Sequence, residues 1–158
     1  MEILKTSNKE EDKFLHQKTK DVDLGSFDAT ELREIVRSMR EKMIEADGIG
    51  LAANQVGLDM NMFVARDSGK FYTVINPKIT KTIGEVVAME EGCLSVPKRQ
   101  GQTQRFEQVV LEGLSPNGKK LKIKAWGLLA HIFQHEVDHL NGIVYTDHAK
   151  NVVDFSNS

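Results

Sequence analysis

The sequence contains a single cysteine, Cys93, among its 158 residues. One cysteine cannot form an intramolecular disulfide, so Cys93 is expected to be a buried thiol, a nucleophile or a metal ligand. No apolar run approaches the roughly 18 to 20 residues needed to cross a bilayer, and the N-terminus lacks the apolar core of a signal peptide. These absences predict a cytosolic protein without a membrane segment.

Neither sign of charge predominates in the chain. The 21 Lys and Arg residues are balanced by 23 Asp and Glu residues, giving a formal net charge of -2. Without a basic stripe to neutralise phosphates, direct binding of nucleic acid is not expected. Repeats and low-complexity tracts are also absent from the sequence. The length and the 40% hydrophobic composition predict a single domain over residues 1–158.

Helical periodicity occurs in two segments. The first begins at Asp28, which forms a capping-box pattern with Glu31, and ends before Gly48. Its apolar positions are Leu32, Ile35, Val36, Met39 and Met43. The second runs over residues 128–140 and is closed by Asn141-Gly142. The sequence thus predicts one helix near each end of the chain.

Short β-rich runs lie between the two helices. Their boundaries are turn signals, namely Ser68-Gly69, Asn76-Pro77 and the hairpin pair Asn117-Gly118. The expected strands are residues 62–65, 71–75, 85–89, 107–114 and 119–125. Residues 1–25 are expected to form a polar N-terminal arm, and residues 148–158 a short polar tail. The order of elements predicts an α+β fold in which short antiparallel sheets pack around the second helix.

The second helix carries the sequence H-E-x-x-H. The spacing of His135 and His139 places both imidazoles on one helix face, with Cβ atoms about 5 to 6 Å apart, which suits one small cation. Glu136 would be the general base towards an attacking water. A chance match on a helix is the alternative, but burying a glutamate beside two histidines would be costly without a compensating ion or partner. The pattern therefore favours a metal-dependent hydrolase.

Sequence spacing alone does not identify the third metal ligand. The extended protease motif fails because Tyr145 stands where it requires a histidine. His131 shares the helix face, but eight residues of helix span about 12 Å, so it is expected to be a pocket wall or a hydrogen-bonded core histidine. His148 is a downstream alternative. Cys93 would be a good thiolate ligand, although a lone cysteine is often a small buried hydrophobe.

Three segments together resemble the signature of the peptide deformylase family. They are Gly48-Ile49-Gly50-Leu51-Ala52-Ala53-Asn54-Gln55, Glu91-Gly92-Cys93-Leu94-Ser95 and Gln134-His135-Glu136-Val137-Asp138-His139-Leu140-Asn141-Gly142. They follow the family's order. The resemblance implies an α+β fold and an enzyme that removes the formyl group from N-formylmethionyl nascent peptides, releasing formate.

The resemblance also assigns roles to individual residues. The implied metal ligands are Cys93, His135 and His139. Glu136 is implied as the residue that moves protons, with Gln55 and the backbone N–H of Leu94 as donors to the oxyanion. The implied cofactor is one divalent ion, Fe(II) in the native enzyme, with zinc, nickel or cobalt as alternatives. The expected substrate contacts are Gly48, Ile49, Gly50, Gly92, Leu128 and His131.

The C-terminal part departs from the family pattern, because typical bacterial relatives continue into a further helix. A ribosome contact that uses such a helix is therefore not expected, although a transient association with the ribosome stays open. A compact bacterial or phage-encoded form, acting in the cytoplasm, fits this tail. Two rivals remain: a zinc peptidase whose third ligand is Asp147 or His148, and a metal-stabilised binding module without turnover.

Overall fold

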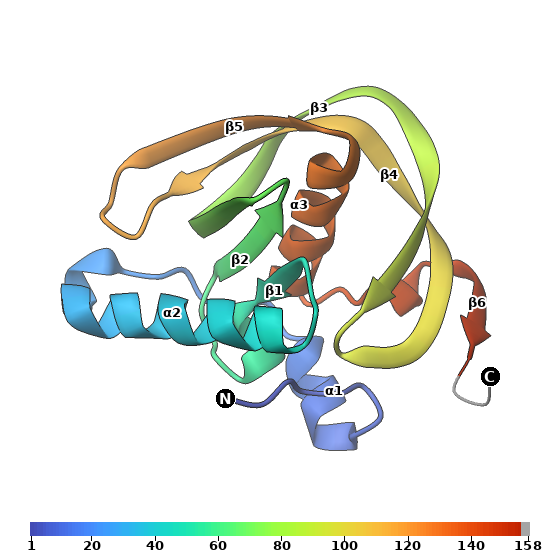
Figure 1. Cartoon of the computed structure of the whole chain (residues 1–158), viewed down its shortest axis with the longest axis horizontal. Coiled ribbons are helices and arrows are strands. Elements are labelled where there is room, and N and C mark those ends of the chain that lie inside the picture. The colour runs from blue at the N-terminus through green and yellow to red at the C-terminus, as the bar shows by residue number, and fades with distance from the viewer. Residues whose placement is uncertain (156–158) are drawn as a thin grey trace.

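A single curved antiparallel sheet wraps around one helix in the computed structural model, which describes residues 1–155 (Figure 1). The strands of this described part are ordered β1-β2-β3-β4-β5, and β6 pairs with β4. Their bounds are β1 (Gly50–Ala52), β2 (Met62–Asp67), β3 (Lys70–Cys93), β4 (Val96–Leu114), β5 (Lys120–Trp126) and β6 (Lys150–Asp154). Helix α3 (Gly127–Leu140) lies on the concave side. The predicted α+β fold is confirmed.

Both predicted helices form. Helix α2 (Ala29–Glu45) begins after Asp28, whose side chain accepts a hydrogen bond from the backbone N–H of Thr30 at 2.7 Å. This bond satisfies one of the free donors at the helix N-terminus. The buried stripe of α2 packs on β1 and β2 and consists of Leu32, Val36, Met39 and Met43. No helix within residues 1–155 is long and apolar enough to cross a membrane.

The two longest strands are longer than the turn signals predicted. The expected strands at 71–75 and 85–89 are parts of the same strand, β3, so the turn predicted at Asn76-Pro77 is wrong. Asn76 takes a positive φ of 51°, and the register with β4 shifts between Ile75 and Lys78. Pro77 has no N–H to give to the ladder, and a bulge accommodates it without reversing the chain.

The hairpin predicted at Asn117-Gly118 is confirmed. Strands β4 and β5 pair up to Leu114 and Lys120, and Gly118 has the positive φ of 83° that the turn requires. Strand β4 itself begins at Val96, about eleven residues before the predicted strand. Its first half was missed because residues 97–106 are mostly polar and do not show an apolar alternation.

Both chain ends contain regular structure. The N-terminal arm includes helix α1 (Lys9–Leu15), whose Leu15 is fully buried with Val96, Val144 and Tyr145. Short 3-10 turns follow at η1 (Leu24–Ser26), η2 (Ala53–Val56) and η3 (Tyr145–Asp147). The polar tail carries β6, which extends the sheet beside the first half of β4. The arm and residues 150–154 of the tail therefore pack on the domain, and residues 156–158 of the predicted tail lie outside the described part of the chain.

Candidate metal centre and peptide groove

Helix α3 is fixed in the sheet by its apolar face. Phe133 is fully buried, with its ring centroid 5.7 Å from that of Phe63 and 5.6 Å from that of Tyr72. The C-terminal end is held by Asn54, whose amide donates to the carbonyl of His139 at 2.6 Å. These contacts fix the orientation of α3, on which the histidines of the H-E-x-x-H motif face the end of β3.

Three potential metal donors converge at this point. His139 Nε2 lies 3.2 Å from Cys93 Sγ and 3.1 Å from His135 Nε2. Within residues 1–155, this is the one cluster of three or more such side chains whose ligand atoms all lie within 4.8 Å of one another. Two ring nitrogens that face each other repel unless a proton or a cation lies between them.

The donor set fits a single transition-metal ion. Donors placed tetrahedrally around zinc, at its usual bond lengths to nitrogen and sulfur, are about 3.3 to 3.6 Å apart. The separations around His139 Nε2 fall slightly below this range. A small adjustment of the side chains would therefore admit one ion, and one thiolate with two imidazoles is a chemically suitable ligand set.

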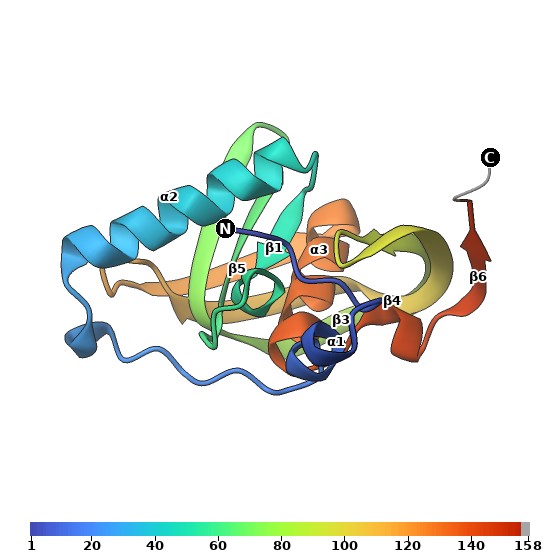
Figure 2. The ribbon, with the colours of Figure 1, turned by 90° about the horizontal axis from the view of Figure 1, so that it is seen from below.

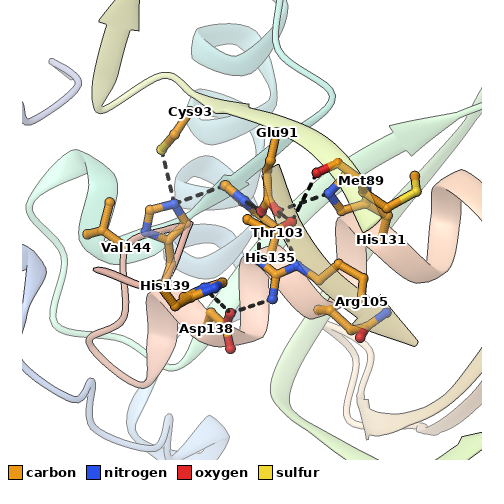
Figure 3. A network of polar contacts seen from close by, with 12 residues as sticks. Met89, Glu91, Cys93, Thr103, Arg105, His131, His135, Asp138, His139 and Val144 are labelled. Carbon is orange, nitrogen blue, oxygen red and sulfur yellow. Dashed lines mark hydrogen bonds and ion pairs between the residues drawn. The ribbon is translucent and has the colours of Figure 1, made fainter. Parts of the chain in front are cut away.

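The carboxylate of Glu91 organises the surroundings of the donors (Figure 3). Arg105 donates to it through Nε at 3.1 Å and through Nη2 at 2.6 Å, and Thr103 donates through its hydroxyl. Nε2 of His131 lies 3.1 Å from the same carboxylate, which also bonds to Nδ1 of His135. With Nδ1 donating to Glu91, Nε2 of His135 is left with a lone pair directed towards Cys93 and His139.

The groups around Glu91 stabilise its charged form. Burial alone would raise the pKa of Glu91, but hydrogen bonds from His131, His135 and Arg105 outweigh burial and hold that pKa far below its usual range. Burial lowers the pKa of Arg105, yet Glu91 and Asp138 together raise it, and Asp138 Oδ2 lies 2.6 Å from Arg105 Nη1. Glu91, Arg105 and Asp138 therefore form a network of paired charges beside the donors.

Sequence reasoning did not single out this polar network. Glu91 belongs to a motif that assigns it no role of its own, and Thr103 and Arg105 lie in a polar stretch outside any predicted strand. The signal was the alternating burial of Gly101, Thr103 and Arg105 on one face of β4, which appears only after the strand is recognised.

Glu136 lies buried beside the donors and lines the adjoining groove. Burial raises its pKa to about 7, while nearby His135 acts in the opposite direction. Its Oε2 has no hydrogen-bond partner within residues 1–155. A Cβ on Gly50 would overlap the Glu136 carboxylate, which explains why this position of β1 is a glycine. The missing side chain lets the β1 backbone approach Glu136 closely.

The side chain of Gln55 is held in one orientation. Its Oε1 accepts a hydrogen bond from the backbone N–H of Ala52 at 2.9 Å. Its Nε2 is thereby directed to Ser95 Oγ at 3.2 Å and to Cys93 Sγ at 3.5 Å. Leu94 follows Cys93 in the two-residue turn between β3 and β4, because Cys93 pairs with Val96. The structure thus brings both expected oxyanion donors close to Cys93.

A groove of about 1010 Å³ opens over the donors. All six expected substrate contacts line it, namely Gly48, Ile49, Gly50, Gly92, Leu128 and His131. The side chains of Ile49 and Leu128 are about half exposed at its rim. Met89 and Ile132 add apolar surface that was not predicted. His131 is a pocket wall bonded to Glu91 and lies outside the donor cluster, as expected.

Comparison with known proteins agrees with this geometry. The model of the polypeptide deformylase family matches residues 2–154. The chain belongs to the polypeptide deformylase family. It is 46% identical to a peptide deformylase of Symbiobacterium thermophilum over 77% of this chain and 57% of that protein. A second relative, from Halothermothrix orenii, is 46% identical over 72% of this chain and 74% of that protein.

Solved structures show the same fold. A peptide deformylase from Synechococcus elongatus, crystallised with actinonin, superposes with a TM-score of 0.87 at 36% identity and covers 96% of this chain and 79% of that chain. The predicted family, fold and enzyme class are confirmed. The matched segment spans little more than half of the Symbiobacterium relative.

The residues of the rival peptidase site are engaged elsewhere. Asp147 binds His16, with Oδ1 at 3.0 Å from Nε2, and caps the backbone N–H of Val144 at 2.8 Å. His148 Nε2 lies 3.7 Å from Asp138 Oδ2. Neither Asp147 nor His148 belongs to the donor cluster of residues 1–155. The geometry thus favours Cys93 as third ligand.

Proposed function

We propose that this chain hydrolyses the N-formyl group of N-formylmethionyl peptides and releases formate. The observation that carries the proposal is the convergence of Cys93, His135 and His139 next to the buried carboxylate of Glu136, in the groove of a deformylase family member. Nascent proteins would supply the peptides in the cytoplasm, with at most a transient contact with the ribosome. Direct binding to nucleic acid forms no part of the proposal.

Cys93, His135 and His139 would hold one divalent ion. A thiolate and two imidazoles accept several transition metals, and Fe(II) is the native ion we propose, with zinc, nickel or cobalt as substitutes. When bound, such an ion acts as a Lewis acid that polarises the formyl carbonyl and lowers the pKa of water. Glu91 would keep His135 in place through its bond to His135 Nδ1. The backbone of α3 would hold both histidines on one helix face.

Glu136 would transfer the protons. Its Oε2 has no partner within the described chain, and its pKa of about 7 suits a group that both accepts and donates protons near neutral pH. Glu136 would accept a proton from the attacking water as oxygen bonds to the formyl carbon. It would then deliver that proton to the peptide nitrogen as the carbon–nitrogen bond breaks, leaving a free amine and formate.

Gln55 and Leu94 would stabilise the negative charge that develops on the formyl oxygen. The Gln55 amide is already oriented by Ala52, so little reorganisation is needed when the charge forms. The backbone N–H of Leu94 would be the second donor, at the turn beside Cys93. Losing one such donor typically costs about 3 to 4 kcal/mol of transition-state stabilisation.

The apolar part of the groove would bind the methionine side chain. Ile49, Leu128 and His131 line it, and Leu128 and His131 lie on α3, the helix that also carries Glu136. Strand β1 is the terminal strand in the sheet order, so the backbone of Gly50, which lines the groove together with Gly48 and Gly92, would offer main-chain hydrogen bonds to an extended peptide. Recognition through the backbone suits substrates of many sequences.

Formate release from formyl-Met-Ala-Ser, by protein purified without oxygen, tests the proposal together with metal analysis of the same sample. We expect formate and about one metal ion per chain, with both lost in Cys93→Ala. His148→Ala is the matched control and should retain both. Metal that persists in Cys93→Ala would favour the peptidase, and bound metal without formate would favour a binding module.

A further inference from the structure

The N-terminal segment joins the two parts of the chain that carry the oxyanion donors. The backbone N–H of Leu4 donates to the carbonyl of Gln55 at 2.8 Å, and the N–H of Thr6 donates to the carbonyl of Ser95 at 3.0 Å. Figure 2 shows this segment, at the blue end of the chain, running past β1 and α3 towards α1. Residues 3–6, here called the N-terminal strap, therefore bridge η2 and the β3–β4 turn.

Consecutive residues of the strap alternate in direction. The N–H groups of Leu4 and Thr6 point to the site, whereas the N–H of Lys5 donates to Glu11 Oε2 at 2.6 Å on α1. Because Leu4 and Thr6 are only two residues apart, their bonds tie the carbonyls of Gln55 and Ser95 to one short stretch of backbone. The strap thus sets the separation between the carbonyls of Gln55 and Ser95, and α1 holds the strap from behind.

The Lys5 side chain binds the turn directly. Its Nζ donates to the carbonyl of Leu94 at 2.7 Å, and the half-buried side chain lines the groove. Leu94 and Ser95 are the two central residues of the turn, and the strap thus engages both carbonyls. The Leu94 N–H belongs to the preceding peptide plane, which meets the plane of the Leu94 carbonyl at the Leu94 Cα, so holding this carbonyl restricts the directions in which the N–H can point. A hydrogen bond donated by a charged ammonium group is stronger than one between two neutral groups.

We propose that Lys5 is a positioning residue, which holds the turn of Leu94 and Ser95 so that the Leu94 N–H and the Gln55 amide point to one oxyanion position. The proposal rests on the proposed function. Lys5 acts through the Leu94 carbonyl and does not contact the reacting atoms. Its removal should thus impair the transition state more than the binding of the substrate.

Three variants test this role. Lys5→Met keeps an unbranched apolar chain one atom shorter but cannot donate a hydrogen bond, and Lys5→Arg restores a cationic donor. Lys18→Met removes an exposed lysine of the N-terminal arm, outside the strap, and is the control. We expect Lys5→Met to lower kcat about tenfold, less than the loss of a whole oxyanion donor, with KM within about twofold. Lys5→Arg should recover most of kcat, and metal content should stay at the wild-type value throughout. Lys5→Met should lower Tm by only about a few degrees, as expected for the loss of one partly buried hydrogen bond.

A second readout does not depend on turnover. In ¹H–¹⁵N spectra of the zinc-loaded protein, Lys5→Met should shift the amide resonances of Leu94 and Ser95, and Lys18→Met should leave them unchanged. Unshifted resonances, or an unchanged kcat, would overturn the proposal, and a rise in KM alone would make Lys5 a substrate contact. Wild-type protein that releases no formate would refute the proposed function, and the spectra would still decide the positioning role.

Discussion

Gly50 in β1 and Glu136 in α3 are in direct apposition, so that a Cβ at position 50 would overlap the Glu136 carboxylate. The two residues are 86 positions apart in the sequence. Through this contact β1, the strand at the edge of the groove, packs directly against Glu136, the buried residue that would transfer protons. A side chain at position 50 must therefore displace either β1 or Glu136.

A Gly50→Ala variant should lose activity with a modest loss of stability. The added methyl group displaces the Glu136 carboxylate, and overpacking of this kind typically costs about 1 to 3 kcal/mol. We expect kcat/KM for formyl peptide to fall at least about tenfold, because small misplacements of a catalytic group are costly. Gly25→Ala, at an exposed 3-10 turn, is the control for urea unfolding and kinetics. Wild-type kinetics in Gly50→Ala would show that the apposition is dispensable.

A Glu136→Gln variant should retain its metal and lose turnover. Glutamine keeps the size of the side chain but cannot accept the proton of the attacking water. General acid–base catalysis contributes about 10²- to 10⁴-fold, and a fall in kcat of this size is expected. Metal content by mass spectrometry should equal that of the wild type, since Glu136 is outside the donor cluster. Near-normal turnover in the metal-loaded variant would exclude Glu136 as the proton-transfer group.

A Glu91→Gln variant should weaken both the fold and the metal site. It removes the negative charge that pairs with buried Arg105, and breaking a buried ion pair typically costs about 3 to 5 kcal/mol. It also alters the acceptor for His135 Nδ1, and loss of such a partner lowers metal affinity about 10- to 100-fold. Glu90→Gln, at the exposed neighbouring position, is the matched control. Chemical unfolding and competition with a metal chelator measure the two effects.

His16 should make stability depend on pH. Burial lowers its pKa, but hydrogen bonds and charge from Asp147 and Asp12 outweigh burial and raise the pKa in the folded state. A raised folded pKa gives stabilisation that is fully present below the unfolded value and is lost as the pH rises through the folded value. The drop in Tm caused by His16→Gln should therefore be larger at about pH 5.5 than at about pH 8.5. Equal drops at both values would refute the linkage.

Local sequence determined the parts of the protein that depend on nearby residues. The cap at Asp28, the periodicity of α2 and α3 and the Asn-Gly hairpin were predicted, because each is set by contacts within a few positions. The H-E-x-x-H spacing likewise defined one face of a helix. Family resemblance, carried by three short motifs, added Cys93 and Gln55, whose roles local spacing left open.

Only the tertiary structure decided how distant residues meet. Cys93 reaches His139 across 46 positions because β3 continues through a bulge at Asn76 and ends against α3. The buried pairing of Glu91 with Arg105 depends on the β3–β4 register, and the contact of Lys5 with Leu94 spans 89 positions. Residue type and periodicity carry no information on such pairings. They are fixed when the curved sheet closes around α3 and the strap packs against the turn.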